Sequence, residues 1–206
     1  MSTSATPSAV ARGRRTLLFI AALFLAPLAA AFWLYYGGAH WRPTGSTHQG
    51  DLIDPARPLP SVELATPDGA TTGAHFLRET WTIVYVGDGL CDARCRKALY
   101  VMRQSRIALN KDFDRVQRAF LVTANCCDRE FLAREHSDLT VALLEGGAAR
   151  RLLDVFPVYD SVPVAEAGRI YVVDPLGNLM MSYAASAPDK ALLQDLRKLL
   201  QLSHIG

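Results

Sequence analysis

The pattern of apolar and polar positions divides the chain into stretches of different character. An apolar run over residues 17–36 contains no charged residue. A stretch rich in Gly, Pro and polar residues follows, and short apolar segments then alternate with polar ones to the end. This pattern predicts a basic segment over residues 1–16, a transmembrane anchor over 17–36, a tether over 37–60 and one globular domain over 61–206.

The apolar run is long enough to cross a membrane as a helix, since about 20 residues span roughly 30 Å, the thickness of the hydrocarbon core. Trp33, Tyr35 and Tyr36 lie at its end, where an aromatic belt is expected. Arginines flank mainly its N-terminal side. We therefore expect residues 1–16 in the cytoplasm, a single pass through the inner membrane and the domain in the periplasm. A cleaved signal peptide, with a small-residue site at residues 28–31, is the alternative.

In the globular part of the chain, the pattern of apolar and polar residues predicts strands that alternate with helices. A continuous apolar, β-branched run predicts a buried strand at residues 81–86. Alternation of strands and helices implies parallel pairing, and a hairpin adds antiparallel strands, so a mixed sheet with helices on both faces follows. The other expected elements are hairpins at 61–69 and 169–183, strands at 116–123 and 139–144, and helices at 91–110, 129–136, 148–156 and 191–202.

Two cysteines are the strongest candidates for chemistry. Cys91 and Cys95 are four residues apart at the predicted helix start, directly after the buried strand. This spacing puts both sulfurs on one face, where they can form a disulfide or bind a soft metal such as Cu(I). The helix N-terminus and the nearby Arg94, Arg96 and Lys97 should favour the Cys91 thiolate. We predict Cys91 and Cys95 as catalytic and metal-binding residues of a thioredoxin-like α/β domain, and a purely structural pair is the alternative.

Two further cysteines, Cys126 and Cys127, follow the predicted strand at 116–123. In a parallel sheet the end of this strand lies at the same edge as the end of 81–86, where functional groups collect. Adjacent cysteines rarely bond each other. We therefore expect either additional thiols near the site or two packed small residues.

Charge excludes one class of partner. The formal net charge is +2, and the first 15 residues contribute three arginines and no acidic residue. The rest of the chain is therefore close to neutral. A domain without a basic excess argues against nucleic acid as a partner.

With these features in place, the sequence resembles the Sco/SenC family of membrane-anchored thioredoxin-like proteins. The matching features are the N-terminal anchor, WTIVYVGDGLCDARC at residues 81–95, the following helix, AFLVT at 119–123 and RIYVVDPLGNL at 169–179. The resemblance implies a role in assembling the copper centre of cytochrome c oxidase, as a copper chaperone or a thiol reductant. It also implies copper as a cofactor, and an oxidase subunit or another copper protein as the partner.

One departure from that family concerns the third copper ligand, a histidine just before the strand matching 169–174. Residues 161–168 contain no histidine, and Glu166 falls near that place. A carboxylate is a hard ligand that suits Cu(I) poorly. Pro163 is a candidate for the cis proline that such folds place opposite the dithiol. All five histidines are expected on the solvated surface: His40, His48, His75, His136 and His204.

Three functions are consistent with the sequence. A Sco-like assembly factor for cytochrome c oxidase is the leading hypothesis. A general periplasmic thiol–disulfide oxidoreductase, an enzyme in its own right, is the second, although CxxxC replaces the usual CxxC. A non-catalytic assembly scaffold with vestigial cysteines is the third.

Overall fold

The structure is a computed structural model that describes residues 7–36, 47–203 and 205–206. The chain divides into two units, Met1–Ser46 and Thr47–Gly206. His40, His204 and residues 37–46 of the predicted tether lie outside the described residues.

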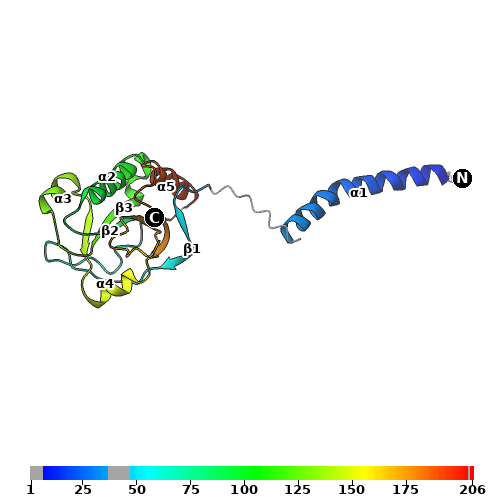
Figure 1. The fold of residues 1–206 in the computed structure, drawn as a ribbon. Helices are drawn as coiled ribbons and strands as arrows, with labels where there is room; N and C mark the ends of the chain where they lie inside the picture. Colours follow the sequence, from blue (N-terminus) through cyan, green and yellow to red (C-terminus); the bar gives the residue numbers. More distant parts are fainter. Residues whose placement is uncertain (1–6, 37–46, 204) are drawn as a thin grey trace. The chain divides into compact units, whose positions relative to one another are not determined.

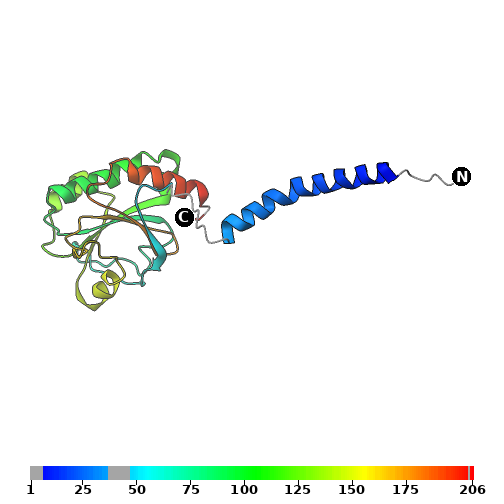
Figure 2. The same cartoon turned by 45° about the vertical axis from the view of Figure 1, so that its right-hand side comes forward.

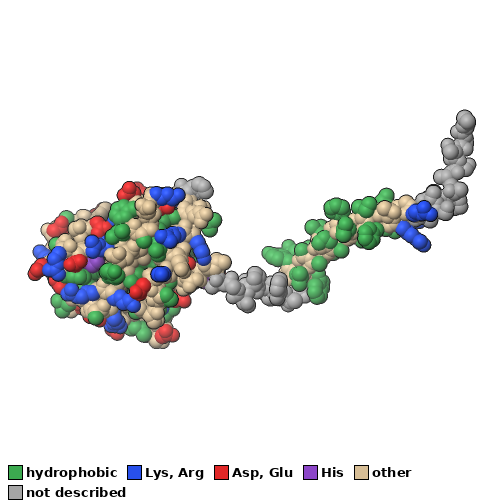
Figure 3. Space-filling view, turned by 90° about the horizontal axis from the view of Figure 1, so that it is seen from above, with side chains coloured by type: hydrophobic (Ala, Val, Ile, Leu, Met, Phe, Trp, Pro, Cys, Tyr) green, Lys and Arg blue, Asp and Glu red, His purple; other side chains and the backbone are tan. Residues whose placement is uncertain are grey.

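The described residues of the first unit form helix α1 (Pro7–Tyr36), which includes Pro27. Its stretch Arg12–Tyr36 has a mean hydropathy of 2.4. Apolar side chains cover this helix, and basic side chains gather at one end (Figure 3). By length and composition this helix can cross a membrane, as the apolar run predicted.

The second unit is built around a six-stranded sheet with the order β1-β6-β5-β2-β3-β4 (Figure 1). β2, β3 and β4 are parallel, and β5, β6 and β1 add antiparallel pairs. The strands are β1 (Asp51–Pro58), β2 (Trp81–Gly87), β3 (Val116–Val122), β4 (Thr140–Leu143), β5 (Ile170–Val173) and β6 (Asn178–Tyr183). The helices are α2 (Ala93–Ile107), the 3₁₀ helix η1 (Asn110–Arg115), α3 (Arg129–Glu135), α4 (Gly146–Leu153) and α5 (Ala191–Leu202).

Alternation along β2 divides the core into two layers. Trp81, Ile83 and Tyr85 belong to one apolar cluster, which includes residues of α2 and α5. Val84 and Val86 belong to the other, which includes residues of α4 and of the segment before β2. α2 and α5 accordingly lie over one face of the sheet and α4 over the other (Figure 2). The predicted mixed sheet with helices on both faces is confirmed.

Two predictions about the region before β2 are wrong. Asp51–Pro58, expected in the tether, forms edge strand β1, because Ile53 is buried and the strand pairs with β6. The expected hairpin at residues 61–69 is reduced to isolated bridges of Ala65 with Thr71 and Leu143. This segment packs its buried apolar residues against the sheet instead of pairing along its length.

A buried carboxylate holds the start of β1 against α5. Asp195 is 2% exposed, and its Oδ2 accepts hydrogen bonds from the backbone N–H groups of Gln49 (2.8 Å) and Gly50 (3.0 Å). The Tyr183 hydroxyl donates to the same oxygen at 3.0 Å. Burial and the charge of Asp195 raise the pKa of Tyr183, so this hydroxyl stays protonated and can donate. One side chain therefore joins the N-terminal end of the domain to β6 and α5.

Asp195→Ala is expected to lower the free energy of unfolding by roughly 2–4 kcal/mol, because several buried donors lose their acceptor. Asp195→Asn keeps one side-chain oxygen as an acceptor and should cost less. Urea unfolding of the full chain in detergent, followed by tryptophan fluorescence, measures both. An Asn variant as unstable as the Ala variant would contradict this account.

Candidate functional site

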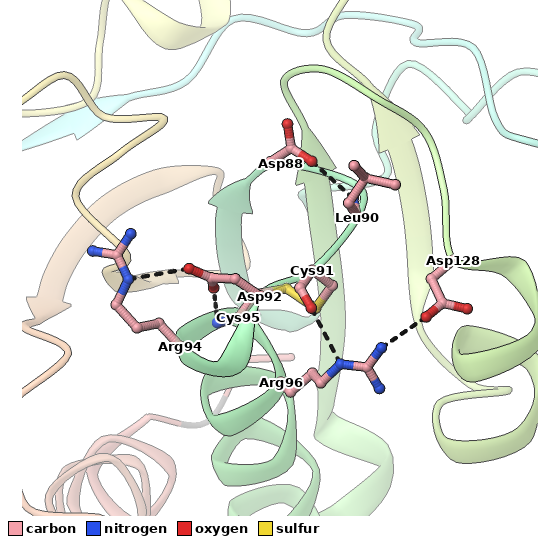
Figure 4. The surroundings of a disulfide bond; sticks show 8 residues. All are labelled: Asp88, Leu90, Cys91, Asp92, Arg94, Cys95, Arg96 and Asp128. Carbon is pink, nitrogen blue, oxygen red and sulfur yellow. Dashed lines mark hydrogen bonds and ion pairs between the residues drawn. A yellow bond between two sulfur atoms is a disulfide. The ribbon is translucent and has the colours of Figure 1, made fainter.

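The predicted cysteine pair lies where β2 passes into α2 (Figure 4). The structure joins Cys91 and Cys95 by a disulfide, with their Cα atoms 5.0 Å apart. Each cysteine is only 2% exposed, and both belong to the apolar cluster under α2. The pair predicted from the CxxxC spacing is therefore brought together, beneath the surface.

Asp92 begins the helix that carries Cys95. Its Oδ1 accepts a hydrogen bond from the backbone N–H of Cys95 at 2.9 Å, the usual geometry of a helix N-cap. This bond holds the pKa of Asp92 below its usual range, so the carboxylate is charged at neutral pH. The N-terminus of α2 points at the cysteine pair and favours a thiolate there once the disulfide is reduced.

The loop after β3 is hydrogen-bonded to the loop that carries Cys91. The Gly89 N–H donates to the Ala124 carbonyl (2.9 Å), and the Asp128 N–H donates to the Gly89 carbonyl (3.1 Å). The Asn125 side chain donates to the Asp88 carboxylate at 2.7 Å. These bonds hold the two loops together at one edge of the sheet.

Gly89 is required by this contact. A Cβ atom at this position would lie 2.7 Å from the Asn125 carbonyl oxygen and 2.8 Å from the Cys126 Cα. Both neighbours are backbone atoms, which cannot move aside as a flexible side chain can. The glycine therefore allows the loop bearing Cys91 to lie directly on the loop bearing Cys126. Sequence reasoning missed this role, although the Gly-Asp-Gly run was its signal.

Arg96 joins the same two loops from the side of α2. Its Nε donates to the Cys91 carbonyl at 3.2 Å, and its Nη2 pairs with the Asp128 carboxylate at 2.8 Å (Figure 4). The guanidinium also lies 4.1 Å from the centre of the Phe131 ring. It is therefore a structural brace of the site.

The three basic residues expected to stabilise the Cys91 thiolate are all paired with carboxylates. Each ion pair partly neutralises the positive field that its cation exerts at the sulfur. The helix N-terminus consequently contributes more to thiolate stability than the sequence alone indicated. The pairs are Arg94 with Asp92 at 3.3 Å, Arg96 with Asp128 at 2.8 Å and Lys97 with Asp189 at 3.1 Å.

The structure corrects the expectation for the second pair of cysteines. Cys126 and Cys127 are joined by a disulfide across a cis peptide bond, with their Cα atoms 3.1 Å apart. Cys126 is exposed and Cys127 is half-buried. All four cysteines, each within the described residues, are thus paired.

The side chains around Cys91 and Cys95 fit a copper ion only in part. A surface pocket borders both cysteines and also contains Tyr85, Glu166 and Gly168. Burial, together with the charge of Asp92, raises the pKa of Tyr85 to about 12, so its hydroxyl is neutral. Within residues 7–36, 47–203 and 205–206, no three His, Cys, Asp or Glu side chains are grouped to hold a metal ion. The reduced sulfurs fit two-coordinate Cu(I), which prefers thiolates, and Glu166 offers only a hard oxygen.

The histidine predicted on a solvated helix face is instead in the core. His136 is 5% exposed, and its Nδ1 lies 3.3 Å from the guanidinium of Arg118, which also pairs with Asp138. Burial and the Arg118 charge lower the pKa of His136 to about 4, so the ring is neutral at physiological pH. His75 is exposed as expected, whereas His48 is half-buried, with Nδ1 2.7 Å from the Gly50 carbonyl.

The cis proline expected opposite the dithiol is not found at Pro163. Among the described residues, the cis peptide bonds are Asp54–Pro55 and Cys126–Cys127. The segment that follows Pro163 lines the pocket beside Cys91 with Ala165, Glu166 and Gly168.

Family comparison matches both parts of the chain. The model of a transmembrane-like, thioredoxin-like, C-terminal domain matches residues 81–203. The model of a transmembrane-like N-terminal domain matches residues 7–38. No curated protein matches the sequence.

Solved structures share the fold of the second unit at low sequence identity. ScoI of Bradyrhizobium japonicum with copper bound is 15% identical, with a TM-score of 0.53 over 68% of this chain and 98% of that one. Apo Sco1 of Thermus thermophilus is 16% identical, with a TM-score of 0.56 over 75% and 99%. The thioredoxin domain of a thiol-disulfide oxidoreductase from Bacteroides vulgatus is 15% identical, with a TM-score of 0.50 over 75% and 99%. The comparison agrees with the resemblance in the sequence and confirms the thioredoxin-like fold.

Gly89→Ala is expected to separate the two loops and lower the free energy of unfolding by roughly 1–3 kcal/mol, as overpacking usually does. Gly73→Ala is the matched control, because a Cβ there meets nothing within 4 Å. Denaturant unfolding of the full chain measures both variants. Equal stability of the two would show that the loops are not in close contact.

Proposed function

Because the chain belongs to the transmembrane-like, thioredoxin-like family, we propose that it is a membrane-anchored thiol reductant serving the copper site of cytochrome c oxidase or of another copper protein. α1 would anchor it by a single pass in the inner membrane. The basic residues Arg12, Arg14 and Arg15 precede the apolar run, which favours a periplasmic location of the domain.

The observation that carries this proposal is the pairing of Cys91 with Cys95 at the start of α2. The two sulfurs are within bonding reach without any movement of the backbone, so the pair can pass between dithiol and disulfide. The helix N-terminus supports the thiolate that such exchange requires. A scaffold with vestigial cysteines would not need this arrangement.

The proposed step is a two-electron exchange. The Cys91 thiolate attacks one sulfur of a disulfide in the copper-binding partner, and the other partner sulfur leaves as a thiolate. The Cys95 thiolate then attacks Cys91 in the mixed disulfide and releases the second partner sulfur. The Cys91–Cys95 dithiol is oxidised to the disulfide, and the partner disulfide is reduced to the two thiols that bind copper.

The proposal that the reductant acts specifically on a copper site rests on the structural likeness to Sco proteins, several of which were solved with copper bound. Likeness to a thiol-disulfide oxidoreductase supports exchange chemistry on this fold in general. A general periplasmic oxidoreductase is therefore the broader form of the same proposal. The two differ in the range of disulfides that are reduced.

A second candidate function is transport of Cu(I) as cargo. The observation that favours it is the placement of two sulfurs beside one pocket, in a fold shared with copper-bound relatives. Thiolates suit Cu(I), and a two-coordinate site holds cargo that a partner with more ligands can take over.

In the organism that encodes the chain, Cys91→Ser with Cys95→Ser is expected to reduce oxidase activity to the level of the deletion strain. An added dithiol should restore the activity, because the missing step is a reduction, whereas added copper should not. Gly73→Ala serves as the control for expression and insertion. Rescue by copper alone would reject the reductant and favour Cu(I) transport.

The reduced full chain in detergent is expected to bind about one Cu(I) per protein through Cys91 and Cys95, and to hold Cu(II) poorly, because Cu(II) prefers imidazole and oxygen ligands. Titration with both ions, followed by bound-metal analysis and visible spectra, measures this. A tight Cu(II) complex with a strong thiolate charge-transfer band would show that a third ligand exists. Unchanged Cu(I) affinity in the double serine variant would remove the pair from the metal site.

A further inference from the structure

The two disulfides differ in their access to solvent. Cys91 and Cys95 are each 2% exposed, whereas Cys126 is exposed and Cys127 is half-buried. We call Cys91 and Cys95 the inner pair and Cys126 and Cys127 the outer pair. The sulfurs of the inner pair border the pocket that contains Tyr85 and Glu166, whereas the outer pair meets solvent directly.

The two pairs also lie in loops that touch each other. The outer pair lies in the loop on which Gly89 packs, with a Gly89 Cβ position 2.8 Å from the Cys126 Cα. Cys127 packs against the same apolar cluster that contains Cys91 and Cys95. The outer pair therefore extends from the solvent to the layer that encloses the inner pair.

The pairs open to different parts of the surface. Cys127 lines a pocket formed with the turn at residues 66–71 and with Arg129 and Leu132 of α3. Cys91 and Cys95 line the separate pocket that contains Tyr85 and Glu166. Two proteins can therefore approach the two pairs from different sides.

From these observations we infer that Cys126 and Cys127 form a second redox site, which receives electrons from an external dithiol protein and passes them to the Cys91–Cys95 disulfide. This inference rests on the proposed redox function of the inner pair. It assigns a role to the exposed disulfide, and it gives electrons a route to the inner pair that leaves the pocket beside Cys91 to the copper-binding partner.

The exchange balances within the chain. An external dithiol first reduces the outer pair and is itself oxidised to a disulfide. The Cys127 thiolate then attacks the Cys91 sulfur, and Cys95 leaves as a thiolate at the start of α2. The Cys126 thiolate attacks Cys127 in this mixed disulfide and releases the Cys91 thiolate. Two electrons and two protons move from the outer to the inner pair.

The kinetic test uses the oxidised full chain in detergent, with reduced thioredoxin as a protein-sized dithiol. Samples are quenched by alkylation, and mass spectrometry follows each pair separately. In the wild type, the outer pair should be reduced first and the inner pair later. Cys126→Ser with Cys127→Ser should slow reduction of the inner pair at least roughly tenfold, because exchange requires access to the sulfur. An unchanged rate would overturn the relay.

An equilibrium measurement separates the relay from the proposed function. In glutathione buffers the inner pair should have the same midpoint potential in the wild type and in the outer-pair serine variant. The substitutions change only the path by which electrons reach the inner pair, and they leave its two end states the same. A shifted midpoint would mean that the outer pair acts on the structure of the site, and would also overturn the relay. An inner pair that cannot be reduced in either protein would instead reject the proposed function.

A trapping experiment tests the intermediate. Cys95→Ser with Cys126→Ser leaves only Cys91 and Cys127, which should join in an intramolecular disulfide on mild oxidation. The matched variant, Cys91→Ser with Cys127→Ser, leaves Cys95 and the exposed Cys126, and should form little such bond. Failure of the Cys91–Cys127 bond in a variant that unfolds cooperatively would overturn the proposed route.

Discussion

The parallel register of β2 with β3 is the constraint on which the site depends. Gly87 at the end of β2 pairs with Val122 at the end of β3, so the two strands finish at the same level. Their following loops must then share one edge of the sheet, where Gly89 lets them touch. A shift of one residue in this register would separate the loops. The loops that carry the two cysteine pairs are adjacent because of this pairing.

Burial and local charge give the two cysteine pairs different chemistry. The inner pair lies in an apolar layer, and the neighbouring cations are already engaged by carboxylates. The N-terminus of α2 is therefore the main feature that stabilises a thiolate there. The outer pair is in contact with solvent. In the proposed relay, this division would separate the partner that supplies electrons from the partner that uses them.

Much of the fold could be predicted from local patterns. The unbroken apolar run at residues 81–86 indicated a buried central strand, and the CxxxC after it indicated the site. Features set by distant contacts could not be predicted. Asp51–Pro58 contains charges and prolines typical of a linker, and becomes a strand only because β6 offers an edge. His136 is at the C-terminal cap of α3, where its ring contacts the buried Arg118 of β3. The spacing of apolar residues along the sequence gives no sign of this contact between distant elements.

The most direct test of the account is a redox titration of the full chain in glutathione buffers, with the Cys91–Cys95 linkage followed by mass spectrometry of alkylated peptides. The account predicts a reversible transition of the inner pair with a two-electron slope, about 30 mV for each tenfold change in the ratio of disulfide to dithiol. An inner pair that remains fully oxidised across the whole range of buffers, while the domain stays folded, would contradict it.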